Sequence, residues 1–217
     1  MKYIFLLSGG LDSTINLGLG LKWTAETLSS SLEPPEQVRQ KIREEVECLT
    51  FDYGQRHHRE IDAAREIAKS YGLQHKIIEA KFFEGCALVG DCDLENGKSE
   101  TAIVPNRNMV FLSIAAAYAM QQGACHVYWS AIKDDADLFK DCRPEFLENM
   151  NKTLDPLGVK IFAPIIGKTK KEIVKIALEE KIDFSQSWSC YRGGQEPCGK
   201  CGACLLREEA IDEAFSV

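Results

Sequence analysis

The loop Ser8–Ser13 is the feature that most restricts the folds open to this chain. It reads Ser-Gly-Gly-Leu-Asp-Ser and directly follows the five apolar residues 3–7, which predict a buried strand. A helical pattern begins at its end and continues over residues 13–28. The loop lacks the Gly-Lys-Ser ending of a Walker A motif and the spaced glycines of a dinucleotide-binding fold. A plain Gly-Gly turn is the alternative, but the complete string after a buried strand favours a phosphate-binding loop.

The backbone and side chains of this loop suit the binding of anionic oxygens. Gly9 and Gly10 let a phosphate approach the main chain closely. Ser8 and Ser13 offer hydroxyl donors, and Ser13 opens a helix whose N-terminus carries partial positive charge. Asp12 would orient the loop or hold Mg²⁺. We therefore expect nucleotide phosphates to bind at Ser8, Gly9, Gly10, Leu11, Asp12 and Ser13.

Apolar runs that predict strands alternate along the chain with stretches that predict helices. The expected strands are residues 3–7, 48–51, 75–78, 125–132 and 160–164, and the expected helices are 13–28, 36–45, 57–71, 108–122, 144–154 and 169–180. Residues 82–101 predict an irregular segment. This alternation is typical of an α/β fold with a parallel, doubly wound sheet and flanking helices on both faces. Such sheets bind ligands at the carboxyl ends of their strands, where the glycine loop lies.

The composition narrows the class of protein and its compartment. A formal net charge of −7 argues against a non-specific nucleic-acid binder, and 45% hydrophobic residues suffice for the core of one α/β domain. The apolar start is too short for a signal peptide, and no apolar run is long enough to span a membrane. We therefore expect a cytoplasmic protein that acts on small molecules, with no membrane or direct nucleic-acid partner.

Cysteines near the C-terminus have the spacing of a metal site. Cys190, Cys198, Cys201 and Cys204 follow the pattern C-x7-C-x2-C-x2-C, and four thiolates make a closed tetrahedral site for Zn²⁺. An iron–sulfur cluster, a redox-active Cys-x-x-Cys pair and free structural cysteines are the alternatives. We predict a nucleotide-binding α/β domain over residues 1–187 and a small subregion, stapled by structural zinc, over residues 188–217.

The loop Ser8–Ser13 resembles the PP-loop of the N-type ATP pyrophosphatases. Four further strings narrow this resemblance. They are LTFDYGQRH at 49–57, VPNRNM at 104–109, DCRPEF at 141–146, and SCY at 189–191 followed by CGKC at 198–201. Together with the loop they are similar, in order, to the 7-cyano-7-deazaguanine synthase (QueC) family, from about residue 3 to about residue 207.

The resemblance implies a PP-loop fold and a C–N bond-forming ligase that uses ATP, Mg²⁺ and Zn²⁺. The family converts 7-carboxy-7-deazaguanine, ammonia and ATP to the nitrile 7-cyano-7-deazaguanine. In the implied route, activation of the carboxylate lets ammonia form an amide, and activation of the amide oxygen lets it dehydrate. Both oxygens leave poorly until they are phosphorylated or adenylated, so the protein contributes positioning and charge stabilisation. Asp12, Ser13, Arg107 and Lys168 are the implied catalytic residues, although Lys168 also fits a solvated lysine at a helix start.

The resemblance also suggests which residues read the substrate. The candidates are Tyr53, Gln55, Asn106, Asn108, Asp141 and Arg143. Helix capping is the competing interpretation for the two asparagines, and a structural salt bridge is the competing interpretation for the Asp–Arg pair. We interpret His57 and His58 as surface residues at a helix start and not as acid–base groups.

Two segments depart from the family pattern. Residues 130–140 differ from the family pattern, which the sequence matches again from Asp141 onward. We expect this segment to line the site, so the choice of substrate depends on these residues. Residues 22–47 are longer than usual and predict a surface for a protein partner or a tolerated insertion. Three functions stay open: the nitrile synthase, a QueC-like synthetase that attaches a deazaguanine or other carboxylate to a protein or other amine, as in an antiviral defence gene cluster, and a non-catalytic nucleotide-binding module. We also expect a homodimer.

Overall fold

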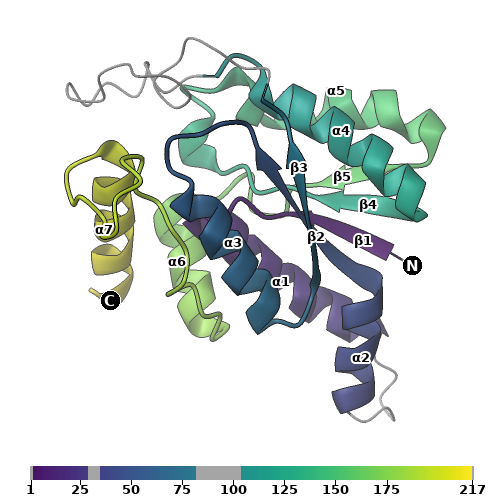
Figure 1. The fold of residues 1–217 in the computed structure, drawn as a ribbon, viewed down its shortest axis with the longest axis horizontal. Helices are drawn as coiled ribbons and strands as arrows, with labels where there is room; N and C mark the ends of the chain where they lie inside the picture. The colour runs from purple at the N-terminus through teal and green to yellow at the C-terminus, as the bar shows by residue number, and fades with distance from the viewer. Residues whose placement is uncertain (1, 29–34, 82–103, 217) are drawn as a thin grey trace.

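The computed structural model describes residues 2–28, 35–81 and 104–216, and its centre is a five-stranded sheet (Figure 1). The strands are β1 (Lys2–Leu6), β2 (Val46–Asp52), β3 (Gln74–Glu79), β4 (Ala124–Tyr128) and β5 (Lys160–Phe162). Their order in the sheet is β3-β2-β1-β4-β5, and every neighbouring pair is parallel. The predicted parallel sheet is confirmed. Strand β4 is shorter than the expected 125–132, because the chain leaves the sheet after Tyr128.

Seven helices accompany the sheet in the described residues. They are α1 (Leu11–Leu28), α2 (Pro35–Glu45), α3 (Arg59–Ser70), α4 (Arg107–Gln122), α5 (Pro144–Leu154), α6 (Lys170–Glu179) and α7 (Gly202–Phe215). All but α7 match a predicted helix. The predicted irregular segment 82–101 lies outside the described residues. None of the described helices combines the length and the apolar character that a membrane crossing requires.

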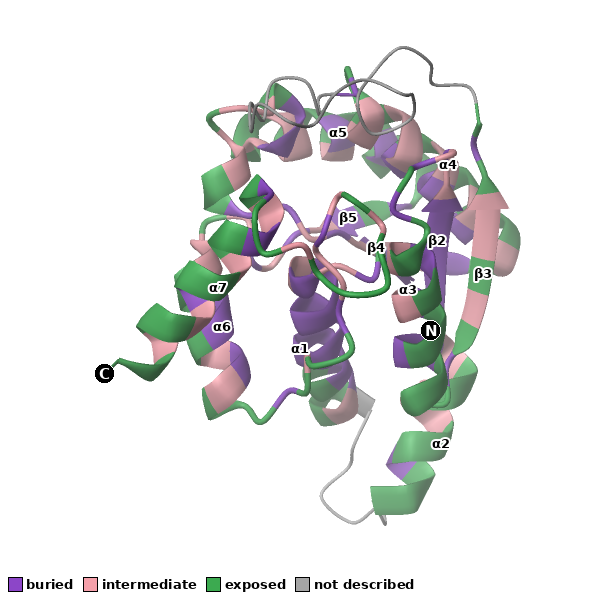
Figure 2. Ribbon diagram, turned by 60° about the vertical axis from the view of Figure 1, so that its left-hand side comes forward, coloured by how far each residue is buried: buried purple, intermediate pink, exposed green. Residues whose placement is uncertain are grey.

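The helices cover both faces of the sheet, as Figure 1 shows. On β1, Ile4 points toward α4 and packs in one cluster with Leu112, whereas Phe5 points the other way and packs with Leu17 of α1. This alternation along a strand that is buried on both faces explains its continuous apolar sequence. Residues 11–21 of helix α1 are almost all buried between the sheet and the neighbouring helices, whereas several residues in its last turns are exposed (Figure 2).

The strand order creates a crevice beside β1. The chain leaves β1 through α1 and α2 to β2 on one side, whereas β4, the other neighbour of β1, is reached through α4 on the opposite face. The loops that follow β1 and β4 therefore diverge, and this point of a doubly wound sheet is where ligands bind. Helix α2 ends directly before β2 begins, so this described part of the predicted 22–47 insertion lies at the amino end of the sheet, away from the crevice.

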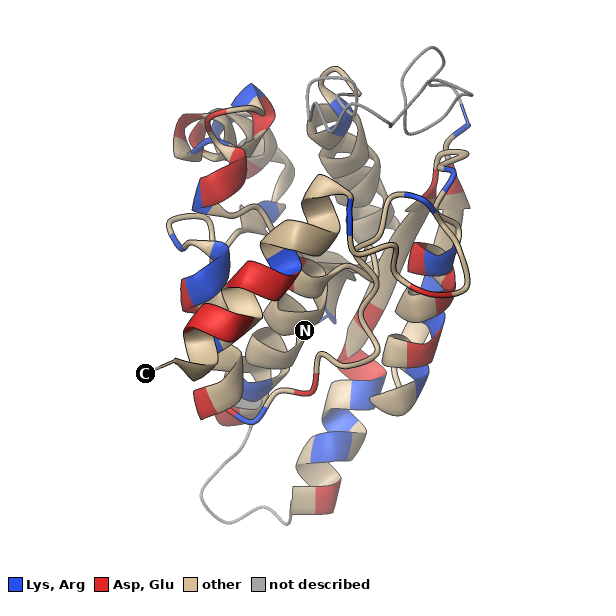
Figure 3. Cartoon of the chain, turned by 90° about the vertical axis from the view of Figure 1, so that its left-hand side faces the viewer, with Lys and Arg blue, Asp and Glu red and all other residues tan. Residues whose placement is uncertain are grey.

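The C-terminal segment packs against the rest of the fold. Helix α7 lies beside α6, and its buried Ala210 joins Ile173 of α6 and Ile15 of α1 in one apolar cluster. Figure 3 shows acidic residues in α7, and Glu209 and Asp212 are among its exposed residues. The exposed side of α7 also carries Leu205, Leu206 and Phe215. The boundary at residues 187 and 188 stays a prediction.

Candidate functional site

A cavity of about 290 Å³ lies at the carboxyl ends of β1, β2 and β4. Its lining comes from the loop after β1, the segments that follow β2 and β4, the first turns of α3, α4 and α6, and the segment that precedes α7. The predicted residues Ser8, Gly10, Leu11, Asp12, Ser13, Tyr53, Gln55, Arg107, Asn108 and Asp141 all line it. Asn106, Arg143 and Lys168 are not part of the lining. The cavity thus joins the glycine loop to most of the residues predicted to bind substrate.

Hydrogen bonds inside the loop hold it in one shape. The Ser8 and Ser13 hydroxyl oxygens lie 3.0 Å apart, and the N–H of Gly10 donates to the Ser8 hydroxyl over 3.1 Å. The Ser13 hydroxyl also lies 3.0 Å from the carbonyl oxygen of Gly10, to which it donates. A loop that is ordered before its ligand arrives loses less conformational freedom on binding.

Gly9 is held from two sides. Its φ angle is +91°, and a Cβ at this position would lie 2.0 Å from the carbonyl oxygen of Glu60 on α3. On the other side, the N–H of Trp188 donates a 2.8 Å hydrogen bond to the carbonyl oxygen of Gly9. Only glycine satisfies both the backbone angle and this close approach.

Asp12 faces a lysine that the sequence analysis did not select. The Lys170 ammonium lies 3.0 Å from Oδ2 of Asp12. The other carboxylate oxygen, Oδ1, is buried and has no hydrogen-bond partner among the described residues. Burial lowers the pKa of Lys170, but the nearby Asp12 and Asp135 outweigh this effect and raise it. Burial, followed by the charge of Asp12, raises the pKa of Asp135 to about 6. The cluster therefore holds more negative charge than Lys170 alone neutralises.

A capping box explains why Lys170 enters the cavity and Lys168 does not. Thr169 is the N-cap of α6: its hydroxyl accepts the N–H of Glu172, and the Glu172 carboxylate accepts the N–H of Thr169. Lys170 is thus the first residue of the helix, at the end that faces the loop, while Lys168 stays in the preceding turn. The Thr-x-x-Glu pattern was the signal in the sequence that would have located this lysine.

Arg107 and several aromatic rings form another part of the cavity wall. The Arg107 guanidinium donates a 2.9 Å hydrogen bond to the Tyr53 hydroxyl and lies 5.2 Å from the centre of the Tyr53 ring. Phe51 and Phe111 stack with their ring centres 4.2 Å apart, and Trp129 also lines the cavity. Flat apolar rings beside a cation suit a planar heterocycle that carries negative charge.

Several of the predicted substrate residues bond to the protein itself. The Gln55 side chain accepts the N–H of Tyr53 and donates to the carbonyl of Phe51, so it holds its own turn. Asp141 accepts the N–H of Asn108 over 3.0 Å and so caps the first turn of α4.

Two further substrate candidates, Asn106 and Arg143, lie outside the cavity lining. The Arg143 side chain donates a 2.8 Å hydrogen bond to the carbonyl of Ala136. Asn106 adopts a left-handed backbone before α4 and makes no side-chain cap bond.

The prediction that His57 lies on the surface is wrong, whereas His58 is exposed as expected. His57 has a side chain only 5% exposed, and its Nε2 lies 2.7 Å from Oε2 of Glu60. Both residues line the cavity. The error arose because α3 begins at Arg59, so that His57 belongs to the loop under the C-terminal segment and not to a solvent-facing helix turn.

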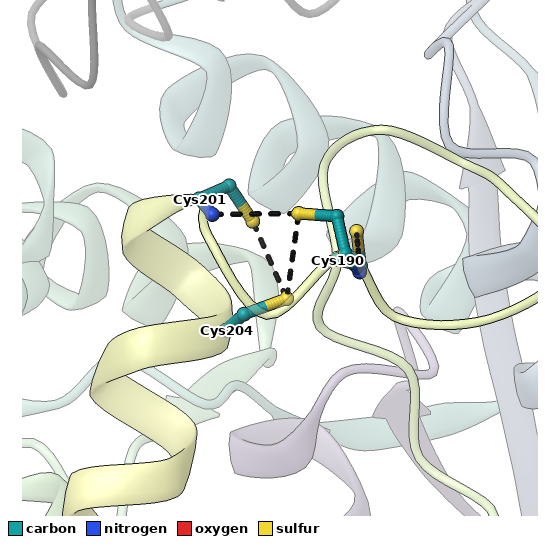
Figure 4. Close-up of side chains that lie close together, drawn as sticks. Cys190, Cys201 and Cys204 are labelled. Atoms are coloured by element: carbon teal, nitrogen blue, oxygen red, sulfur yellow. Dashed lines mark hydrogen bonds between the residues drawn. The ribbon is translucent and has the colours of Figure 1, made fainter.

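The four C-terminal cysteines come together as predicted. The sulfur atoms of Cys190, Cys198, Cys201 and Cys204 all lie within 4.8 Å of one another, a grouping that could hold a metal ion. Figure 4 shows Cys190, Cys201 and Cys204 converging from the loop and the first turn of α7. The Cys198 sulfur lies 4.0 Å from that of Cys204, and it accepts the N–H groups of Lys200 and Cys201. Burial raises the pKa of Cys198, but these donors outweigh burial and lower it to about 6.

Comparisons with known proteins agree with the geometry. The family model described as queuosine biosynthesis protein QueC matches residues 36–215. The 7-cyano-7-deazaguanine synthase 1 of Colwellia psychrerythraea is 36% identical, over 98% of this chain and 94% of its own length. The 7-cyano-7-deazaguanine synthase of Thermoplasma acidophilum is also 36% identical, over 99% of this chain and 89% of its own length.

A solved structure shares the fold. The U34-tRNA thiolase NcsA of Methanococcus maripaludis superimposes with a TM-score of 0.52 at 18% identity, over 98% of this chain and 64% of the thiolase. At this identity the likeness shows the α/β fold and nothing finer. The match to the family model and the sequence identities over nearly the whole chain show the family as well as the fold. This chain belongs to the QueC family of queuosine biosynthesis proteins.

Proposed function

We propose that this protein is a ligase that converts 7-carboxy-7-deazaguanine and ammonia to 7-cyano-7-deazaguanine, with ATP activating first the carboxylate and then the amide. Relatives that carry this synthase name over nearly the whole chain support the proposal. The observation that carries it is one cavity whose lining includes the loop Ser8–Ser13, several aromatic rings and the half-buried Arg107. Phosphate and planar base would thus be held a short distance apart, as an activation of the base's carboxylate requires.

The loop Ser8–Ser13 would bind the ATP phosphates, with Lys170 at the start of α6 as the facing cation. Arg107 would neutralise charge that develops on the transferred group, since its guanidinium lies at the cavity wall. Mg²⁺ fits at Asp12, because one carboxylate oxygen there is buried and has no hydrogen-bond partner among the described residues. The ion would also offset the excess negative charge that Asp12 and Asp135 create.

The cysteine group fits one Zn²⁺ ion. Zinc–sulfur bonds of about 2.3 Å place tetrahedral thiolates about 3.8 Å apart. The sulfur atoms of Cys201 and Cys204 lie 3.5 Å apart, and those of Cys198 and Cys204 lie 4.0 Å apart, so they bracket this value. An iron–sulfur cluster would hold its thiolates farther apart, because iron and sulfide atoms fill the space between them. The ion would supply structure and no chemistry, since a closed set of four ligands leaves no open position.

A second function is favoured by the segment in which the chain departs from the family pattern. Residues 130–140 give the cavity Asp135 and Phe139, so a changed sequence here changes the site itself. The same activation would then transfer a deazaguanine or other carboxylate to a protein or other amine, and α2 would offer a surface for such a partner. A homodimer in the cytoplasm is part of the same proposal.

The experiment is to incubate the protein with ATP, Mg²⁺, ammonia and 7-carboxy-7-deazaguanine and to follow the product mass. The expected result is the amide mass followed by the nitrile mass, with ATP consumed at both stages. ATP turnover only when a protein amine is added would establish the second function in place of the first. If no carboxylate causes turnover of ATP, the result would support a non-catalytic nucleotide-binding module. Metal analysis should find zinc without iron or sulfide.

A further inference from the structure

A buried histidine and a carboxylate form a pair beside the phosphate loop, and no role has yet been given to them. His57 Nε2 and Glu60 Oε2 lie 2.7 Å apart, with side chains 5% and 17% exposed. Both residues line the cavity. The second carboxylate oxygen, Oε1, lies 3.8 Å from the point where a Cβ on Gly10 would stand, so it adjoins the loop itself.

The surroundings of the pair include Arg107 and Tyr191, which line the same cavity as Glu60. Burial lowers the pKa of Arg107, but nearby groups, Tyr53 and Glu60 first among them, outweigh burial and raise it. The Tyr191 ring meets the His57 ring edge-on, with the centres 5.8 Å apart. Glu60 therefore adjoins the loop Ser8–Ser13 and lines the same cavity as Arg107, on which its charge acts.

The hydrogen-bond partners of His57 indicate which of its ring nitrogens carries the proton. Nδ1 of His57 is buried and has no hydrogen-bond partner among the described residues. A proton on Nδ1 would be a buried donor without an acceptor, which is unfavourable. The neutral ring with its proton on Nε2, donated to Glu60, is the form that fits. The carboxylate is then ionised, oriented by the histidine, and able to take a proton on Oε1.

We propose that Glu60, oriented by His57, accepts the protons that the substrate nitrogen loses in C–N bond formation. The inference rests on the proposed function and assigns the base for it. In the first stage, the nitrogen of ammonia bonds to the activated carbon, the carbon–oxygen bond to the phosphorylated oxygen breaks with its electron pair, and a nitrogen proton passes to Glu60. In the second stage, one proton of the amide nitrogen passes to Glu60 and on to water as the amide oxygen is activated, and the remaining nitrogen proton passes to Glu60 as the carbon–oxygen bond breaks with its electron pair and the carbon–nitrogen triple bond forms. Between the stages the proton passes to water.

Glu60→Gln tests this role, because the amide keeps the size of the side chain and removes its basicity. Two nucleophiles are compared under identical ATP, Mg²⁺ and 7-carboxy-7-deazaguanine conditions. Ammonia is largely protonated at neutral pH, and its adduct is the weaker acid of the two because ammonia is the stronger base, so its reaction depends on a positioned base. Hydroxylamine is a free base at neutral pH and traps the activated carboxylate as a hydroxamate. Its adduct loses a proton readily to water.

The expected result is that Glu60→Gln lowers nitrile formation from ammonia by about 100-fold or more, while hydroxamate formation changes less than about threefold. Glu66→Gln on the same helix is the matched control, since that side chain is 63% exposed, and it should leave both reactions unchanged. His57→Gln should lower kcat with ammonia and leave the KM for ATP unchanged, because it disturbs the orientation of the base and not the phosphate loop.

Equal loss of both reactions in Glu60→Gln would overturn the proposal, because the residue would then serve activation or ATP binding. Unchanged nitrile formation would overturn it as well. A wild-type protein that yields no hydroxamate would show that the carboxylate is not activated at all. That outcome removes the proposed function first, so the two failures are distinguishable.

Discussion

The N–H of Trp188 donates a 2.8 Å hydrogen bond to the carbonyl oxygen of Gly9. The Trp188 indole N–H in turn donates to the carbonyl of Cys190 over 2.9 Å. Arg207 on α7 secures the same segment by hydrogen bonds to the hydroxyls of Ser187 and Ser189. The segment that carries the clustered cysteines and the loop Ser8–Ser13 are therefore parts of one hydrogen-bonded unit.

Loss of the metal should weaken nucleotide binding. Cys204→Ser removes one thiolate, and we expect a lower Tm and an ATP affinity reduced about fivefold or more, since one hydrogen bond contributes about 1 kcal/mol. Calorimetric titration with ATP and thermal unfolding measure the two effects. Cys125→Ser, which changes a half-buried cysteine outside the group, is the matched control. ATP affinity that survives loss of the metal would show that the two sites are independent.

Lys170 and Lys168 should differ sharply in their effect on ATP use. Lys170→Met removes the cation that faces Asp12, and we expect kcat/KM for ATP to fall by about 100-fold or more. Lys168→Met changes a residue outside the cavity lining and should alter it less than about threefold. Steady-state kinetics with varied ATP make the comparison. A larger loss in Lys168→Met would restore the assignment made from the sequence.

Gly9→Ala should reduce stability and ATP binding by more than the strain of a positive φ angle alone would. The new methyl group would lie 2.0 Å from the Glu60 carbonyl oxygen, so α3 or the loop must move. Gly123→Ala is the control, because its φ is +70° and nothing lies within 4 Å of the added carbon. We expect the control to cost about 1 kcal/mol of unfolding free energy and Gly9→Ala to cost more and to abolish ATP binding. Urea denaturation and ATP titration measure both, and equal effects would contradict the clash.

Asp135 should make the unliganded protein less stable as the pH rises. Its folded pKa of about 6 lies above the usual value of 3.8, so the folded chain binds the proton more tightly than the unfolded chain between these values. Stability is therefore lost as the pH rises from about 4 to about 6. Asp135→Asn should recover roughly 1–3 kcal/mol at pH 8 and almost nothing at pH 4. Urea denaturation without Mg²⁺ or nucleotide tests this, and a gain of equal size at both pH values would contradict it.

The elements of the sheet and the loop at its centre could be predicted because their signals are local. A buried strand, two glycines and a helix start follow one another within residues 3–13, and the cysteine spacing is equally compact. Lys170 was missed because proximity to Asp12, 158 positions earlier, is a property of the assembled fold. His57 was missed for the same reason, since Tyr191 covers it.

Helix α7 was missed for a different physical reason. Its N-cap is Cys201, and its first turn contains Gly202 and Cys204, a composition that favours a loop when read alone. Helical structure there depends on packing of Ala210 against α6 and on the convergence of the thiols. At the start of α7, tertiary contacts thus override the weak helix propensity of the local sequence.

The lining of the cavity runs from Leu6 to Ala203, nearly the full length of the chain. On the ribosome, β1 and the glycine loop emerge first, and the residues that close the cavity emerge last. A nascent chain that ends before Trp188 therefore contains every strand of the sheet but lacks the N–H that bonds to Gly9. The part of the cavity wall that the C-terminal segment supplies is completed only after the whole sheet has been synthesised.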